Sequence, residues 1–177
     1  MSGALRLFMS GVDALSDGAG KIAAWCLVAI GFFITWEVVM RYVFVAPTIW
    51  VDEVSRYLMV WVVFLSSAYV LKRQEMITIE VLLGDPASPK RKLAETLATV
   101  MLLIFAGTAV YYGFQIWLKY TLAGHTTDSY LAPPKWLTHA PVWVGGLLFA
   151  LQGLVQLIRV WRNELPDPKD NPLEISH

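Results

Sequence analysis

Long stretches without a charged side chain dominate the pattern of hydrophobic and polar positions in this chain. Two of them, 96–118 and 136–158, run for 23 residues, and two shorter ones, 22–36 and 57–71, run for 15 residues. About 20 helical residues, at roughly 1.5 Å each, cross the ~30 Å of hydrocarbon in a bilayer. The shorter stretches reach that length only together with the charged residues at their ends. The pattern therefore predicts four spans, at about 22–43, 52–71, 94–118 and 135–160.

The predicted fold class is an all-α membrane protein. Lipid tolerates no open sheet edge, and the chain has no series of alternating strands of about ten residues. Residues 1–163 should form a single four-helix transmembrane domain. Residues 164–177 contain three Pro and several charged side chains, so we expect them to form a disordered cytoplasmic tail.

A second helical pattern precedes the first span. It has apolar residues at helical spacing with polar residues between them, at Leu5, Phe8, Val12 and Leu15. This pattern predicts a short amphipathic helix that lies along the inner membrane surface or docks on protein. Lys21 directly precedes the apolar run, and no small-x-small cleavage site closes that run. We therefore expect no cleavable signal, and the first span should be retained.

Composition fits a membrane location and excludes several classes of function. The chain is 56% hydrophobic and only 16% charged, against about 25% charged in a typical soluble domain. Lys plus Arg and Asp plus Glu number 14 each, so there is no basic excess to bind nucleic acid. The single Cys26 excludes an internal disulfide, and the first three spans have no His to hold haem or a di-metal centre. No catalytic motif, cofactor site or metal site is predicted.

The distribution of Lys and Arg predicts the orientation of the spans. Counted outside or at the ends of the spans, ten of these residues lie on the side of the two termini and of the loop between the second and third spans, and four lie on the opposite side. Lys and Arg concentrate in the cytoplasmic loops of membrane proteins. Both termini should therefore be cytoplasmic.

Two charged residues lie near the outer end of the first span. Glu37 precedes Arg41 by four residues, which is the favourable acid-then-base order on one helix face. A local ion pair explains both residues, since an adjacent Arg favours the ionised carboxylate. A carboxylate at Glu37 that binds protons or cations is the functional alternative, because a charge inside a span needs a partner or a function.

The outer loop leads into the second span with several signals for the start of a helix. Pro47 favours a helix start, and Thr48 can cap the helix. Asp52 and Glu53 suit the positive end of the helix dipole. Trp50 is expected to anchor the loop at the lipid headgroups.

Arg56 does not fit this simple scheme, because a cation is mildly disfavoured at the N-terminal end of a helix. It needs an acid, which Glu53, Asp52, Glu37 or a partner protein can supply. We favour a network that bridges the first two spans.

The fourth span carries small and amide side chains. Gly146 and Ala150 form a small-xxx-small pair with Gly153 beyond them, which allows another helix to approach closely. Gln152 and Gln156 form a polar strip toward the inner end and need hydrogen-bond partners, either in this chain or in a second membrane protein. Helix packing explains these residues better than a transport path does.

The chain resembles, nearly from end to end, the small membrane subunit (DctQ type) of tripartite ATP-independent periplasmic (TRAP) transporters. The most specific match is segment 41–57, which is similar to the family pattern R-Y-x-F-x-x-P-x-x-W-x-[DE]-E-x-x-R. A more weakly specific match is the start of the fourth span, with Pro134, Trp136, Pro141 and Gly145.

A further stretch, 72–82, resembles the basic segment that follows the second helix in members of this family, together with the acidic and apolar residues after it. Its matching residues are Glu75, Ile77, Ile79 and Glu80. Members often have Gly and His where this chain has Gln74 and Met76. No role of that His is therefore carried over to this chain.

The resemblance implies a noncatalytic subunit of the bacterial inner membrane, surrounded by lipid, that joins a large multi-pass permease subunit. In such systems the large subunit holds the substrate and sodium sites and moves as an elevator, while a periplasmic binding protein delivers an organic acid. The small subunit would scaffold the large one and offer part of the docking surface for the binding protein. The outer network would set the angle of the first two helices and reach the large subunit through Glu37, Arg41, Asp52, Glu53 and Arg56. The sequence does not identify the transported acid.

Two other functions remain open at this stage. A self-sufficient four-helix exporter would use Glu37 to exchange protons for cations or drugs, although Arg41 and the charge bias oppose this function. The second open function is that of a four-helix assembly factor without any link to transport. Neighbouring genes for a large permease and a secreted binding protein would distinguish a transporter subunit from an assembly factor.

Overall fold

Four long helices make up the fold. The computed structural model describes residues 3–73 and 89–162. All four helices are long and apolar enough to cross a membrane, and no β-strand occurs in the described residues. The all-α fold class, with four helices long and apolar enough to cross a membrane, is thus confirmed. The helices are α1 (Gly3–Tyr42), α2 (Ile49–Lys72), α4 (Pro89–Leu122) and α5 (Lys135–Arg162).

The first helix is longer than the sequence pattern predicts. The expected amphipathic helix and the first span form one continuous helix of 40 residues. Its buried face begins at Met9 and Val12 and continues into the span through Ser16 and Ala19. Met9 and Val12 form a core cluster with Val155 of α5, so this part of α1 docks on protein. Of the predicted stripe, Phe8 and Leu15 remain exposed.

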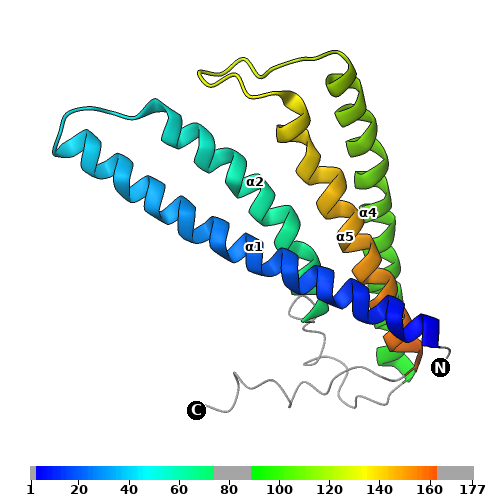
Figure 1. The fold of residues 1–177 in the computed structure, drawn as a ribbon. Helices are drawn as coiled ribbons and strands as arrows, with labels where there is room; N and C mark the ends of the chain where they lie inside the picture. Colours follow the sequence, from blue (N-terminus) through cyan, green and yellow to red (C-terminus); the bar gives the residue numbers. More distant parts are fainter. Residues whose placement is uncertain (1–2, 74–88, 163–177) are drawn as a thin grey trace, which may run out of the picture.

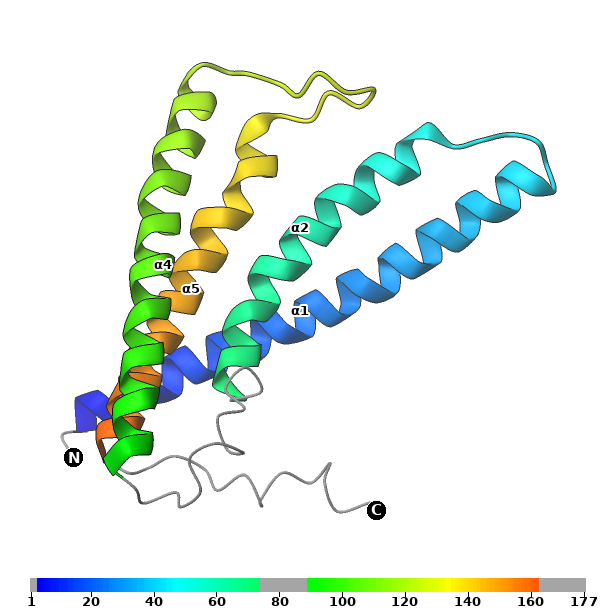
Figure 2. The ribbon, with the colours of Figure 1, turned by 180° about the vertical axis from the view of Figure 1, so that it is seen from behind.

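The helices are arranged as two hairpins, α1 with α2 and α4 with α5 (Figure 1). The end of the molecule at which α1 begins and α5 ends is called the basal end, and the opposite end the distal end. The hairpins lie close together at the basal end and diverge toward the distal end, as Figure 2 shows from behind. They are joined chiefly by α2 against α5, and α1 also contacts α5. Each hairpin therefore offers a large surface that this chain does not cover.

Glycines mark the closest approaches between helices. A Cβ atom built on Gly145 of α5 would stand only 2.5 Å from Cβ of Phe64 in α2, and one on Gly146 would stand 3.1 Å from the side chain of Val110 in α4. On Gly153 it would stand 3.0 Å from Leu103, also in α4. The missing side chains let α5 pack between its two neighbours without steric overlap.

The predicted domain boundary and tail fall partly outside the described residues. Residues 164–177 lie there, as does most of the family-like stretch 72–82.

Candidate functional site

At the distal end, Glu37 links the two helices of the first hairpin. Oε1 of Glu37 accepts hydrogen bonds from Nη2 of Arg41 at 2.7 Å and from its Nε at 3.1 Å. Oε2 accepts the backbone N–H of Thr48 at 2.8 Å and the Thr48 hydroxyl. The Glu37 side chain is only 7% exposed. Both carboxylate oxygens are therefore occupied, by one residue of α1 and one at the start of α2.

This arrangement corrects the predicted cap of the second helix. Thr48 is the N-cap residue of α2, but its side chain makes no cap hydrogen bond to that helix. Its hydroxyl donates to Glu37 instead, and the carboxylate of Glu37 also takes the N–H of Thr48. A negative charge supplied by α1 thus lies at the positive end of α2. Sequence reasoning missed this because the two residues lie eleven positions apart on different helices.

A tight turn brings these two residues together. Val45 has φ 53°, a left-handed conformation that β-branched residues rarely adopt. Such backbone strain persists only where surrounding contacts hold it. The bonds between Glu37 and Thr48 are contacts that hold it here.

The second acidic residue, Glu53 of α2, contacts the opposite hairpin. Its Oε2 accepts the backbone N–H of Leu131 at 3.0 Å, and its Oε1 accepts the hydroxyl of Ser129. The hydroxyl of Tyr57, one turn further along α2, donates to Glu53 at 3.3 Å. These bonds tie the distal part of α2 to loop 123–134, which connects α4 with α5. We call this group of contacts the Glu53 clasp.

The remaining predicted residues of this region do not join either group of contacts. Asp52 and Arg56 are exposed, and neither makes a hydrogen bond or an ion pair within the described parts of the chain. Pro47 is exposed in the connection between the first two helices. Trp50 is 37% exposed and its ring packs edge-on against Phe33 of α1 at 5.8 Å. The single network expected at the sequence level is therefore two separate clusters, one around Glu37 and one around Glu53.

The basal end holds a third polar cluster, which sequence reasoning did not assemble. Gln152 of α5 is fully buried, accepts the hydroxyl of Ser16 at 2.8 Å and donates to Asp13 at 3.2 Å. Arg159 forms an ion pair with the same Asp13. Lys72, at the end of α2, pairs with Asp17 at 2.6 Å. The acidic residues of the predicted amphipathic pattern thus fasten α1 to α5 and to α2.

Two buried polar atoms of α5 lie apart from this cluster. Oε1 of Gln156 and the indole N–H of Trp143 have no hydrogen-bond partner within the described residues. Gln156 is 3% exposed, so its amide is buried. Gln152, one turn away, has hydrogen-bond partners for both its Oε1 and its Nε2. The two glutamines of the predicted polar strip therefore have different environments.

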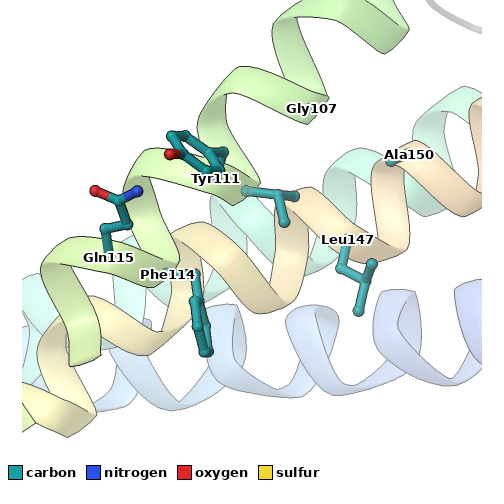
Figure 3. A pocket seen from close by; sticks show the side chains of 7 residues that line it. Gly107, Tyr111, Phe114, Gln115, Leu147 and Ala150 are labelled. Carbon is teal, nitrogen blue, oxygen red and sulfur yellow. The ribbon is translucent and has the colours of Figure 1, made fainter.

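An open groove of about 540 Å³ lies between α4 and α5 (Figure 3). Its wall is mostly apolar and has no charged side chain; it is formed by Gly107, Val110, Tyr111, Phe114, Gln115, Leu147 and Ala150. A Cβ atom on Gly107 would meet nothing within 4 Å, so the packing of this chain alone does not require that glycine. Among the described residues, no group of three His, Cys, Asp or Glu side chains is placed to hold a metal ion.

The fold and these clusters describe a multi-pass membrane protein whose polar groups mainly connect its helices. The family model of the DctQ component of tripartite ATP-independent periplasmic transporters matches residues 30–163, more than half of the chain. The chain belongs to this family. A search of curated proteins returns no match to the chain.

Proposed function

We propose that this chain is the noncatalytic small membrane subunit of a TRAP transporter and scaffolds a large sodium-coupled permease subunit of the elevator type. The complex takes up an organic acid that a periplasmic binding protein delivers. Membership of the DctQ family supports the type of complex. The exposed apolar surfaces of both hairpins, including Trp25 at 74% and Phe105 at 70% exposure, are open to lipid and to a partner in the membrane.

One observation favours a scaffold over a self-sufficient exporter: the occupied carboxylate of Glu37. An exporter needs an acidic group that can exchange a proton for a cation on each cycle. Here Arg41 and Thr48 take up both oxygens of Glu37, and they do so to hold α1 against α2. The Glu53 carboxylate is likewise bonded on both oxygens.

The proposed location is the inner membrane of a bacterium, with both termini in the cytoplasm. The excess of Lys and Arg on the side of the termini supports this orientation. The basal end would then face the cytoplasm, and the Glu37 and Glu53 clusters would face the periplasm. A reporter active only in the periplasm, fused after Val45, should be active, and one fused after Arg162 should not.

Copurification tests the partnership. The tagged chain is coexpressed with a large TRAP permease subunit from the same organism and extracted in mild detergent. We expect a stable complex that contains both subunits. Recovery of the tagged chain alone, under conditions in which both proteins are present in the membrane, would contradict the proposal.

A further inference from the structure

One face of α2 is left uncovered by both of its neighbours. Four of its residues recur at positions i, i+4, i+7 and i+11 and therefore share one side of the helix: Asp52, Arg56, Met59 and Val63. All four are exposed, Met59 at 53% and Val63 at 57%. The neighbouring sides of α2 are covered, one by α1 through Val62 and the other by the α4–α5 hairpin through Leu71. We call the four exposed residues the α2 stripe.

The stripe places the charged side chain of Arg56 at the edge of the hydrocarbon, where lipid tails cannot solvate a charge. The 15 charge-free residues 57–71 of α2 extend over roughly 22 Å, which is less than the ~30 Å of hydrocarbon. At least one end of α2 therefore brings a cation to the edge of the hydrocarbon. At the basal end Lys72 pairs with Asp17 at 2.6 Å. At the distal end Arg56 has no ion pair or hydrogen bond within the described residues.

The pair of charges in α1 is closed, whereas the equivalent pair in α2 is open. Glu37 and Arg41 have the spacing of Asp52 and Arg56, and they form a closed ion pair at 2.7 Å. Asp52 and Arg56 lie one turn apart on the stripe yet form no ion pair within 4.0 Å. Neither group is in an ion pair within the described residues, although Arg56 acts electrostatically on Glu53 and Asp52 on Arg41. The α2 stripe thus presents one negative and one positive group above an apolar surface, neither held by a direct bond. A helix with complementary charges at the same level can satisfy both groups.

We propose that the α2 stripe docks a transmembrane helix of the large permease subunit, and that this helix carries a carboxylate opposite Arg56. This inference rests on the proposed function, because it requires that the large subunit is the partner. Arg56 forms the charged contact near the distal surface, and Met59 and Val63 pack against the same helix deeper in the membrane. Arg is suited to this contact because its planar guanidinium binds a carboxylate with two parallel hydrogen bonds.

The first arm of the test reverses the charge. In the coexpressed complex, Arg56→Glu should lower the amount of copurified large subunit at least about tenfold, because it places two like charges together in a desolvated contact. Arg56→Lys, which keeps the charge but loses the second parallel hydrogen bond, should lower the yield of the complex less than Arg56→Glu does. Lys119→Glu is the matched control, since Lys119 is an exposed cation in the last turn of α4, away from the stripe. It should leave the complex unchanged.

The second arm does not depend on how the charge variants fold. A photoreactive phenylalanine analogue is placed at position 63 of the stripe. A second variant carries it at position 104 of α4, away from the stripe, for comparison; Ile104 is 60% exposed there. We expect crosslinks from position 63 to the large subunit, and the crosslinked peptide should contain an Asp or Glu about one to two turns toward the periplasm. Changing that acidic residue to Arg should restore the complex with Arg56→Glu.

Two results would overturn the inference while leaving the proposed function in place. One is a complex of wild-type yield with Arg56→Glu. The other is labelling of lipid alone from position 63, which would assign Arg56 to a phospholipid headgroup. If the wild-type chain itself does not copurify with the large subunit, the proposed function fails, so the two failures are distinguishable.

Discussion

The carboxylate of Glu37 in α1 accepts the backbone N–H of Thr48, the N-cap residue of α2, at 2.8 Å. One side chain thereby closes the first hairpin and satisfies a donor that α2 leaves free at its start. Arg41 holds the same carboxylate in position from one turn away. The charge inside the first span is explained by this local architecture, without any transported ion.

Replacing Glu37 by Ala should loosen the distal end of the first hairpin. The change leaves Arg41 and the N–H of Thr48 without their acceptor, so we expect a thermal midpoint several degrees lower. Cys26 provides the measurement, because it is the only cysteine and is partly buried beside the core cluster of Ala23, Ile30 and Val62. A thiol-reactive dye should label it at a lower temperature in the variant. Unchanged labelling would contradict the role assigned to Glu37.

Replacing Glu53 by Ala should release loop 123–134 from α2. The amide of Leu131 loses its acceptor, and hydrogen exchange in the loop should accelerate markedly while exchange in the middle of α4 and α5 stays slow. Asp52→Ala is the matched control, since Asp52 is adjacent but exposed and makes no such bond. Equal exchange in the two variants would show that the clasp does not hold the loop.

The two glutamines of α5 should respond in opposite ways. Gln152→Leu leaves the hydroxyl of Ser16 and Oδ1 of Asp13 without their amide partner at the basal end, and we expect it to cost about 1–3 kcal/mol of stability. Gln156→Leu removes a buried amide whose Oε1 has no partner in the described chain, so it should be neutral or stabilising. Both free energies can be measured by unfolding in mixed micelles. A larger loss for Gln156→Leu would refute this assignment.

The glycines of the helix contacts should not tolerate a side chain. Gly145→Ala would bring Cβ within 2.6 Å of the carbonyl oxygen of Phe64, which is backbone and cannot move aside easily. Overpacking of this kind costs about 1–3 kcal/mol. Gly31→Ala in α1 is the control, because its Cβ would meet nothing within 4 Å and Ala favours a helix by about 1 kcal/mol. A tolerated Gly145→Ala would mean that α2 and α5 are further apart than described.

The spans were predictable from sequence because hydrocarbon imposes a simple rule of length and charge. The pair of Glu37 and Arg41 was predictable as well, since both residues lie on one helix four positions apart. The Glu53 clasp was not, because Ser129 and Leu131 lie 76 and 78 positions away and only the fold brings them to α2.

The basal cluster shows why the amphipathic pattern did not predict one continuous first helix. In the sequence, Asp13 and Asp17 are polar residues of the predicted amphipathic helix and carry no sign of a partner. In the structure they are partners of Arg159 and Lys72, so the polar residues are part of the packed interface. Sequence periodicity cannot separate a solvated acid from one that pairs with a distant helix.

Reconstitution into liposomes tests the proposed function most directly. The chain alone, the large subunit alone and both together are compared for sodium-driven uptake of the organic acid that copurifies with the binding protein. We predict uptake only when both membrane subunits and the loaded binding protein are present, and no exchange of tetraphenylphosphonium for protons by the chain alone. Proton-coupled exchange by the chain alone, or full uptake without it, would contradict the assignment of this protein as a scaffold subunit.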